Sequence, residues 1–143
     1  DLVDMKNIAS VLRIRRSGAP AEQLSRVLLP GGAVGMDVLA EGLSAPLTEW
    51  TGRFATYSWC EPVREGVAAF ERTGSIAALE RLCENDLLAV FRRKRYELTC
   101  VEPIIGYLLG QESQIAAIRA VMVAQLNGLD RETLGERLRE LYV

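Results

Sequence analysis

The residues best suited to chemistry are carboxylates that recur four positions apart. Glu61 and Glu65 form one such pair, and Glu132 and Glu136 form another. Paired carboxylates can act as general acid and base, but this spacing on a helix is far more typical of a solvated face. The chain has no histidine, which excludes histidine-based triads. The glycine-rich residues 31–35 lack the lysine of a phosphate-binding loop. The sequence therefore predicts no catalytic residue, no cofactor and no ATP hydrolysis by this chain itself.

The three cysteines also give no sign of a metal site. The chain has an odd number of cysteines, which are widely spaced, and it has no histidine. They are Cys60, Cys83 and Cys100. This pattern argues against both a zinc site and a disulfide framework. A reducing cytoplasm is the simpler setting for such a chain.

Composition and charge describe an ordinary globular chain. Its 143 residues are 49% apolar, enough for a core, and its net charge is −2. This balance gives no general reason to expect nucleic acid as a partner. The exception is a basic run of Arg92, Arg93, Lys94 and Arg95. Its first interpretation is solvated charge at the negative end of a helix dipole; the alternative is a patch for an acidic protein partner or lipid headgroups.

The elements that carry these residues have helical periodicity throughout. The first helix is expected to begin at Asp4 as N-cap and to run to about Arg16, and Pro20 can open a second. The glycines and prolines of residues 31–62 favour short helices with tight turns. Ser75 is expected to cap a long helix that ends near the basic run.

A helix from Pro103 to about Leu126 has two contrasting sides. At about 100° per residue, its large apolar residues form one stripe and its small residues form the opposite one. Two packed sides indicate a central helix with neighbours on both. Gly106 and Gly110 form a GxxxG pattern, but the polar residues 111–114 and Arg119 interrupt any transmembrane span.

A polar belt crosses this same helix. Gln111 lies within the apolar stripe, and Glu112 and Arg119 flank it. If these residues are buried they need hydrogen-bond partners. Internal hydrogen bonding or local exposure is one interpretation, and a surface that contacts another protein of a complex is the other.

The sequence repeats itself at a long interval. Residues 17–28 and 127–138 align without gaps at an offset of 128 − 18 = 110, and the match extends back to Ile8 and Ile118. Both copies read as an apolar helix, a turn with glycine and a short amphipathic helix. We therefore expect an all-α fold, a helical bundle repeat with one complete and one partial copy of a unit of roughly 110 residues. Residues 1–143 would form a single all-helical domain, in which residues 1–30 end a preceding repeat and residues 31–143 form the C-terminal repeat.

The C-terminal copy carries a family resemblance. Residues 102–121, EPIIGYLLGQESQIAAIRAV, followed by NGLDRETLGERLRELYV, resemble the end of the C subunit of the V/A-type ATPases, the equivalent of the d subunit of eukaryotic vacuolar enzymes. Residues 1–32 are similar to an internal segment of that family. Gln114, Ala116 and Ala117 depart from its charged or amide residues. The truncated first repeat and the start at Asp1 lead us to expect a C-terminal fragment.

The resemblance implies a non-catalytic central-stalk subunit of a rotary ATPase. Its partners would be the central shaft, made of the D and F subunits, and the membrane proteolipid ring. It would lie peripherally at the cytoplasmic face of the membrane and transmit torque for proton or sodium transport. The positions that carry over, as elements of the helical repeat or as partner contacts, are Glu102, Tyr107, Glu112 and Arg119. Arg92, Arg93 and Arg95 are the further interface candidates.

A second hypothesis is a helical-repeat adaptor that binds proteins without a role in ion transport. Its common repeat units are about 30–50 residues long, shorter than the interval seen in this sequence.

Overall fold

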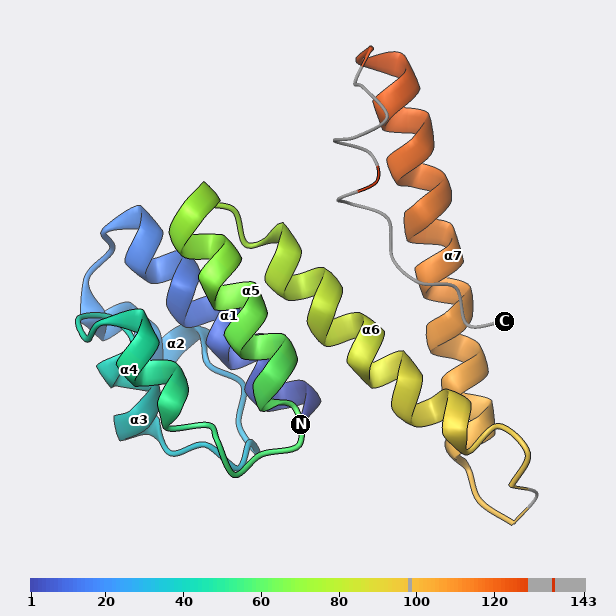
Figure 1. Ribbon diagram of the computed structural model, residues 1–143, viewed down its shortest axis with the longest axis horizontal. Helices are drawn as coiled ribbons and strands as arrows, with labels where there is room; N and C mark the ends of the chain where they lie inside the picture. Colours follow the sequence, from blue (N-terminus) through green and yellow to red (C-terminus); the bar gives the residue numbers. More distant parts are fainter. Residues whose placement is uncertain (98, 129–134, 136–143) are drawn as a thin grey trace. The chain divides into compact units, whose positions relative to one another are not determined.

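The computed structural model describes residues 1–97, 99–128 and 135, and all regular structure in this part of the chain is helical (Figure 1). The elements, in chain order, are α1 (Leu2–Ser17), the 3₁₀ turn η1 (Ala21–Gln23), α2 (Leu24–Val27), α3 (Met36–Glu41), α4 (Leu47–Gly52), α5 (Cys60–Thr73), α6 (Ala77–Arg93) and α7 (Glu102–Leu126). The predicted all-α class is confirmed for the described residues. The repeat unit itself stays a prediction.

The chain divides into two compact units, Asp1–Cys83 and Glu84–Val143. The first holds α1 to α5 and the beginning of α6, and the second holds the rest of α6 and α7. Both segments that flank the expected repeat boundary at residue 30 lie inside the first unit. That boundary, and the single domain of residues 1–143, stay predictions.

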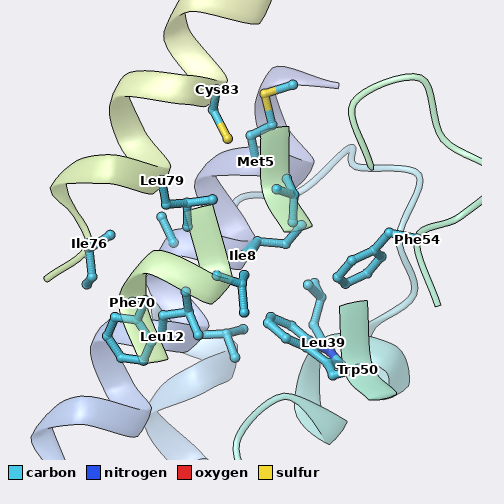
Figure 2. Packing of buried hydrophobic residues seen from close by; sticks show 14 of the residues in the cluster. Met5, Ile8, Leu12, Leu39, Trp50, Phe54, Phe70, Ile76, Leu79 and Cys83 are labelled. Carbon is cyan, nitrogen blue, oxygen red and sulfur yellow. The ribbon is translucent and has the colours of Figure 1, made fainter. Parts of the chain in front are cut away.

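Helix α1 supplies the centre of the first unit. Ile8, Val11 and Leu12 are fully buried there, and Figure 2 shows Ile8 and Leu12 among side chains of α3 to α6. Burying each such side chain contributes about 1.5–3 kcal/mol. The helix therefore has core neighbours around most of its circumference, which explains why its buried residues do not form a single stripe.

Aromatic side chains close the end of this core near α4. Trp50 and Phe54 meet edge to face with ring centroids 5.2 Å apart, and Tyr57 stacks on Trp59 at 4.8 Å. The Trp50 indole N–H donates to the Val38 carbonyl at 2.7 Å, so its polar atom is satisfied inside the core. The short helices predicted for residues 31–62 are confirmed as α3 and α4, and these rings join them to α5.

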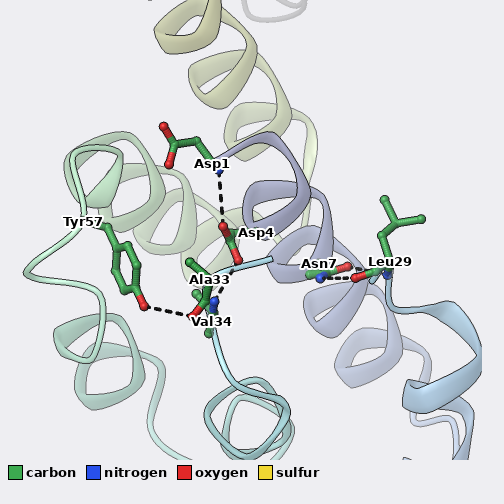
Figure 3. A network of polar contacts seen from close by, with 7 residues as sticks. All are labelled: Asp1, Asp4, Asn7, Leu29, Ala33, Val34 and Tyr57. Carbon is green, nitrogen blue, oxygen red and sulfur yellow. Dashed lines mark hydrogen bonds and ion pairs between the residues drawn. The ribbon is translucent and has the colours of Figure 1, made fainter. Parts of the chain in front are cut away.

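Buried polar side chains of α1 hold the irregular chain that crosses it. Asn7 accepts a hydrogen bond from the Leu29 N–H at 2.8 Å and donates to the Leu29 carbonyl at 3.0 Å. Asp4 accepts the Val34 N–H at 3.0 Å (Figure 3). The prediction of Asp4 as N-cap is therefore wrong: α1 begins at Leu2, and the Asp4 carboxylate bonds a loop instead of its own helix end.

Two predicted helix ends are confirmed by their backbone geometry. Gly18 ends α1 with φ 65°, and Gly74 ends α5 with φ 68°. Both lie in the left-handed region that side chains with a Cβ disfavour. After Gly74, the Ser75 hydroxyl accepts the Ala77 N–H at 3.3 Å, which agrees with Ser75 as the cap of α6.

The close approach of α5 to α6 predicts the effect of Gly66→Ala. A Cβ on Gly66 would stand 2.5 Å from the Leu79 Cα, so the two helices would have to separate. We expect the free energy of unfolding, measured by urea denaturation, to fall by about 1–3 kcal/mol. Gly52→Ala is the control, because a Cβ there meets nothing within 4 Å. Equal stability of the two variants would contradict the packing.

The two hydrogen bonds between Asn7 and the backbone of Leu29 predict the effect of Asn7→Ala. The substitution removes both hydrogen bonds that hold the backbone of Leu29. We expect a loss of about 1–2 kcal/mol in the free energy of unfolding and faster amide exchange at Leu29. Ser25→Ala, which removes an exposed hydrogen bond to Glu22, should change stability by less than about 0.5 kcal/mol. Unchanged exchange at Leu29 would argue against the anchor.

Candidate functional site

The segment between α6 and α7, residues 94–101, holds a compact group of ionisable side chains; we call it the α6–α7 link. Lys94 Nζ lies 2.8 Å from Glu102 Oε1, which joins the end of α6 to the first residue of α7. The Cys100 thiol lies 3.4 Å from Glu97 Oε2. Glu102, one of the positions singled out by the family resemblance, therefore has a structural partner close by in the chain.

Three side chains of this group have shifted pKa values. The hydrogen bond from Lys94, with smaller contributions from backbone and Cys100, lowers the pKa of Glu102 from 4.5 to about 2. The same hydrogen bond raises the pKa of Lys94. Burial, followed by hydrogen bonds to Glu102 and Glu97, raises the pKa of the Cys100 thiol. The link therefore carries a fixed ion pair and a protonated thiol at neutral pH, which favours a structural role over nucleophilic chemistry.

The basic run lies at the end of α6, as expected. Arg92 and Arg93 occupy its last turn, and Arg95 follows in the link. Burial raises the pKa of Asp86, and the nearby Arg93 guanidinium partly offsets that rise. The Arg95 guanidinium lies 4.7 Å from the centre of the Tyr96 ring. Arg93 and Arg95 are exposed, whereas Arg92 is half-buried.

The three remaining candidate residues lie along α7 and face solvent. Tyr107, Glu112 and Arg119 are all exposed. Glu112 and Arg119, seven positions apart, share one side of the helix and line a shallow hollow of about 470 Å³ with apolar neighbours such as Ile115 and Val123. Of the interpretations offered for the polar belt, local exposure holds for Glu112 and Arg119. The structure does not bring them to the α6–α7 link.

The two sides of α7 differ from the expected pattern. Its small-residue side is buried at Gly106, Gly110, Ser113 and Ala124. The stripe of large apolar residues is exposed, at Ile104, Leu108, Ile115, Ile118, Met122 and Leu126. Among the described residues no neighbour covers the large apolar stripe, so the expected contact on that side stays a prediction. Small residues allow close approach of a neighbour, whereas helical periodicity does not say whether a large apolar stripe meets its own core or another molecule.

The described residues offer surfaces for binding more than groups for catalysis. Among residues 1–97, 99–128 and 135, acidic and thiol side chains nowhere gather in threes as a metal site would need. Within the same residues, every helix is too short or too polar to cross a membrane. The exposed apolar stripe and the charges beside it are the features that a partner could recognise.

Comparison with known proteins identifies the family. The sequence profile of the ATP synthase (C/AC39) subunit matches residues 1–137. The chain belongs to this family. Among similar proteins, the C subunit of the A-type ATP synthase of Pyrococcus horikoshii is 31% identical over 146 residues, which are 98% of this chain and 37% of that protein.

Two further relatives agree with this assignment. The corresponding A-type ATP synthase protein of Pyrococcus furiosus is 31% identical over 85% of this chain and 33% of its own length. That of Thermococcus gammatolerans is 28% identical over 96% of this chain and 37% of its own length. The chain thus spans about a third of the length of these relatives. No solved structure matches it at a significant level.

The pairing of Lys94 with Glu102 is a feature that sequence reasoning missed. In the sequence the lysine is one of four cations at a helix end, and the glutamate is a position of the family motif. The available signal was their separation of 102 − 94 = 8 positions across a predicted turn. That separation allows a contact, but only the path of the link brings the two charges to 2.8 Å.

The ion pair predicts a pH dependence at Glu102. Because its folded pKa is lowered to about 2 from 4.5, the stabilisation by this pair is present above the ordinary pKa and disappears as the pH falls through about 2. Lys94→Gln should raise the Glu102 pKa towards 4.5, measured by carboxyl-carbon NMR titration. Arg64→Gln, which breaks the separate pair with Glu61, should leave it unchanged. A normal Glu102 pKa in the unsubstituted chain would refute the pairing.

Proposed function

We propose that this chain is part of a non-catalytic central-stalk subunit of an A/V-type rotary ATPase. In this role the protein links the central shaft, formed by the D and F subunits, to the membrane proteolipid ring. It transmits torque between ATP chemistry and proton or sodium transport at the cytoplasmic face of the membrane. The observation that carries the proposal is the family match over residues 1–137.

The packing of the first unit supports a mechanical role. A torque-transmitting part has to resist deformation, and close-packed interiors have few alternative arrangements. In this unit α5 approaches α6 so closely that Gly66 leaves no room for a Cβ beside Leu79. Asn7 and Asp4 further tie the loop at residues 29–34 to α1. Close helix contacts and anchored loops would both limit twisting of the unit under load.

The surface of α7 supports a role in assembly. Glu112 and Arg119 flank a hollow with apolar lining, and the large apolar stripe is exposed on the same helix. Mixed apolar and charged surfaces are typical of protein interfaces with a polar rim. Contacts made through exposed charges would weaken as salt rises. We therefore propose this part of α7, with Tyr107, as a candidate contact with a neighbouring protein of the complex.

The repeat supports the same assignment. Gly18 and Gly128, which the offset of 110 pairs, both adopt left-handed backbone with φ 65° and 63°. Each follows the end of a long helix, α1 or α7. Equivalent turns after equivalent helices are what a duplicated unit predicts. The second half of the C-terminal copy lies outside the described residues.

Reconstitution of ion pumping tests the proposed function. Membranes stripped of the peripheral ATPase head and of the central-stalk protein are supplied with the head, with or without the full-length parent of the chain. We expect ATP-driven ion uptake only when the parent is present, because torque would otherwise not reach the ring. ATP hydrolysis by the head alone is the control and should persist in both samples. Full ion pumping without the full-length parent protein would contradict the rotor assignment and favour the adaptor hypothesis.

A further inference from the structure

The α6–α7 link combines positive charge with exposed aromatic and aliphatic side chains. Residues 92–102 contain four cations and two carboxylates, and one of those carboxylates, Glu102, is paired with Lys94. Arg93 and Arg95 are exposed. This short segment is therefore locally basic in a chain whose net charge is −2.

The apolar side chains beside these charges face solvent. Tyr96 is 78% exposed, Val101 58% and Ile104 63%. Val101 and Ile104 are three positions apart, so they share one side at the start of α7. The Arg95 guanidinium lies over the Tyr96 ring at 4.7 Å, which keeps cation and aromatic together. We call Arg93, Arg95, Tyr96, Val101 and Ile104 the link surface.

We propose that the link surface binds anionic lipid headgroups. The exposed cations Arg93 and Arg95 are attracted to an anionic leaflet, and tyrosine and arginine have an apolar body and a polar tip that suit the headgroup region. The aliphatic side chains of Val101 and Ile104 would enter the boundary with the acyl chains. An acidic protein would be attracted by the same charges, so binding to an acidic polymer is the alternative outcome of the test.

The Lys94–Glu102 pair gives this surface its shape. It joins Lys94, the residue after α6, to Glu102, the first residue of α7. The pair cancels the charges of Lys94 and Glu102 against each other, which leaves Arg93 and Arg95 as the exposed cations of the surface. The link surface therefore offers both positive charge and apolar side chains to a lipid headgroup.

Vesicle sedimentation of the full-length parent tests the proposal without relying on the rotor role. We expect binding to phosphatidylcholine vesicles that contain phosphatidylglycerol, weaker binding to pure phosphatidylcholine, and release at high salt. The double variant Arg93→Gln/Arg95→Gln should lower partitioning by roughly 10- to 30-fold. Arg26→Gln/Arg72→Gln, which removes two exposed charges from α2 and α5, is the matched control and should bind like the unsubstituted protein.

Three results would overturn the proposal. The first is equal binding to neutral and anionic vesicles, and the second is equal loss of binding in the two double variants. The third is a full-length parent that does not bind vesicles but binds polyglutamate, with binding that is lost in Arg93→Gln/Arg95→Gln. That result would make an acidic protein the ligand. Circular dichroism of each variant, expected to be unchanged, separates loss of binding from loss of the fold.

Discussion

The first unit depends on the burial of α1, a helix that carries both apolar and polar groups into the interior. Ile8 and Leu12 bring the apolar contacts, while Asn7 and Asp4 satisfy backbone groups of the loop that crosses the helix. Buried polar groups cost free energy unless they are paired. Because these partners come from the loop, Asn7 and Asp4 can be buried with their hydrogen bonds made only when the loop lies across α1.

The second unit is organised differently. Helix α7 buries its glycines and small residues and leaves its large apolar side chains exposed. Ile8, which the predicted repeat pairs with Ile118, is fully buried. The two residues that the predicted repeat pairs thus have opposite environments. This contrast fits a family whose members are parts of a larger assembly, since an apolar stripe of this size favours contact with another surface.

The charges of the chain serve local order more than chemistry. Lys94 and Glu102 close the link between two helices, and Arg15 donates to the carbonyls of Gly42 and Ala45. In both cases a long side chain joins segments that have no regular hydrogen bonds to each other. Cations that hold the turns of their own chain are consistent with the mechanical role proposed for this chain.

The helical class, the main helix ends and the family could all be predicted from the order of the residues alone. Periodicity of apolar residues and glycine at positive φ are local properties, so Gly18, Gly74 and the extent of α7 were accessible in this way. Which residues each helical face contacts could be seen only in the tertiary structure. Asp4 bonds Val34 across 30 positions, and α7 buries its small side, because pairing partners and close approaches depend on how distant segments meet. The same reason explains why the Lys94–Glu102 pair became visible only with the path of the link.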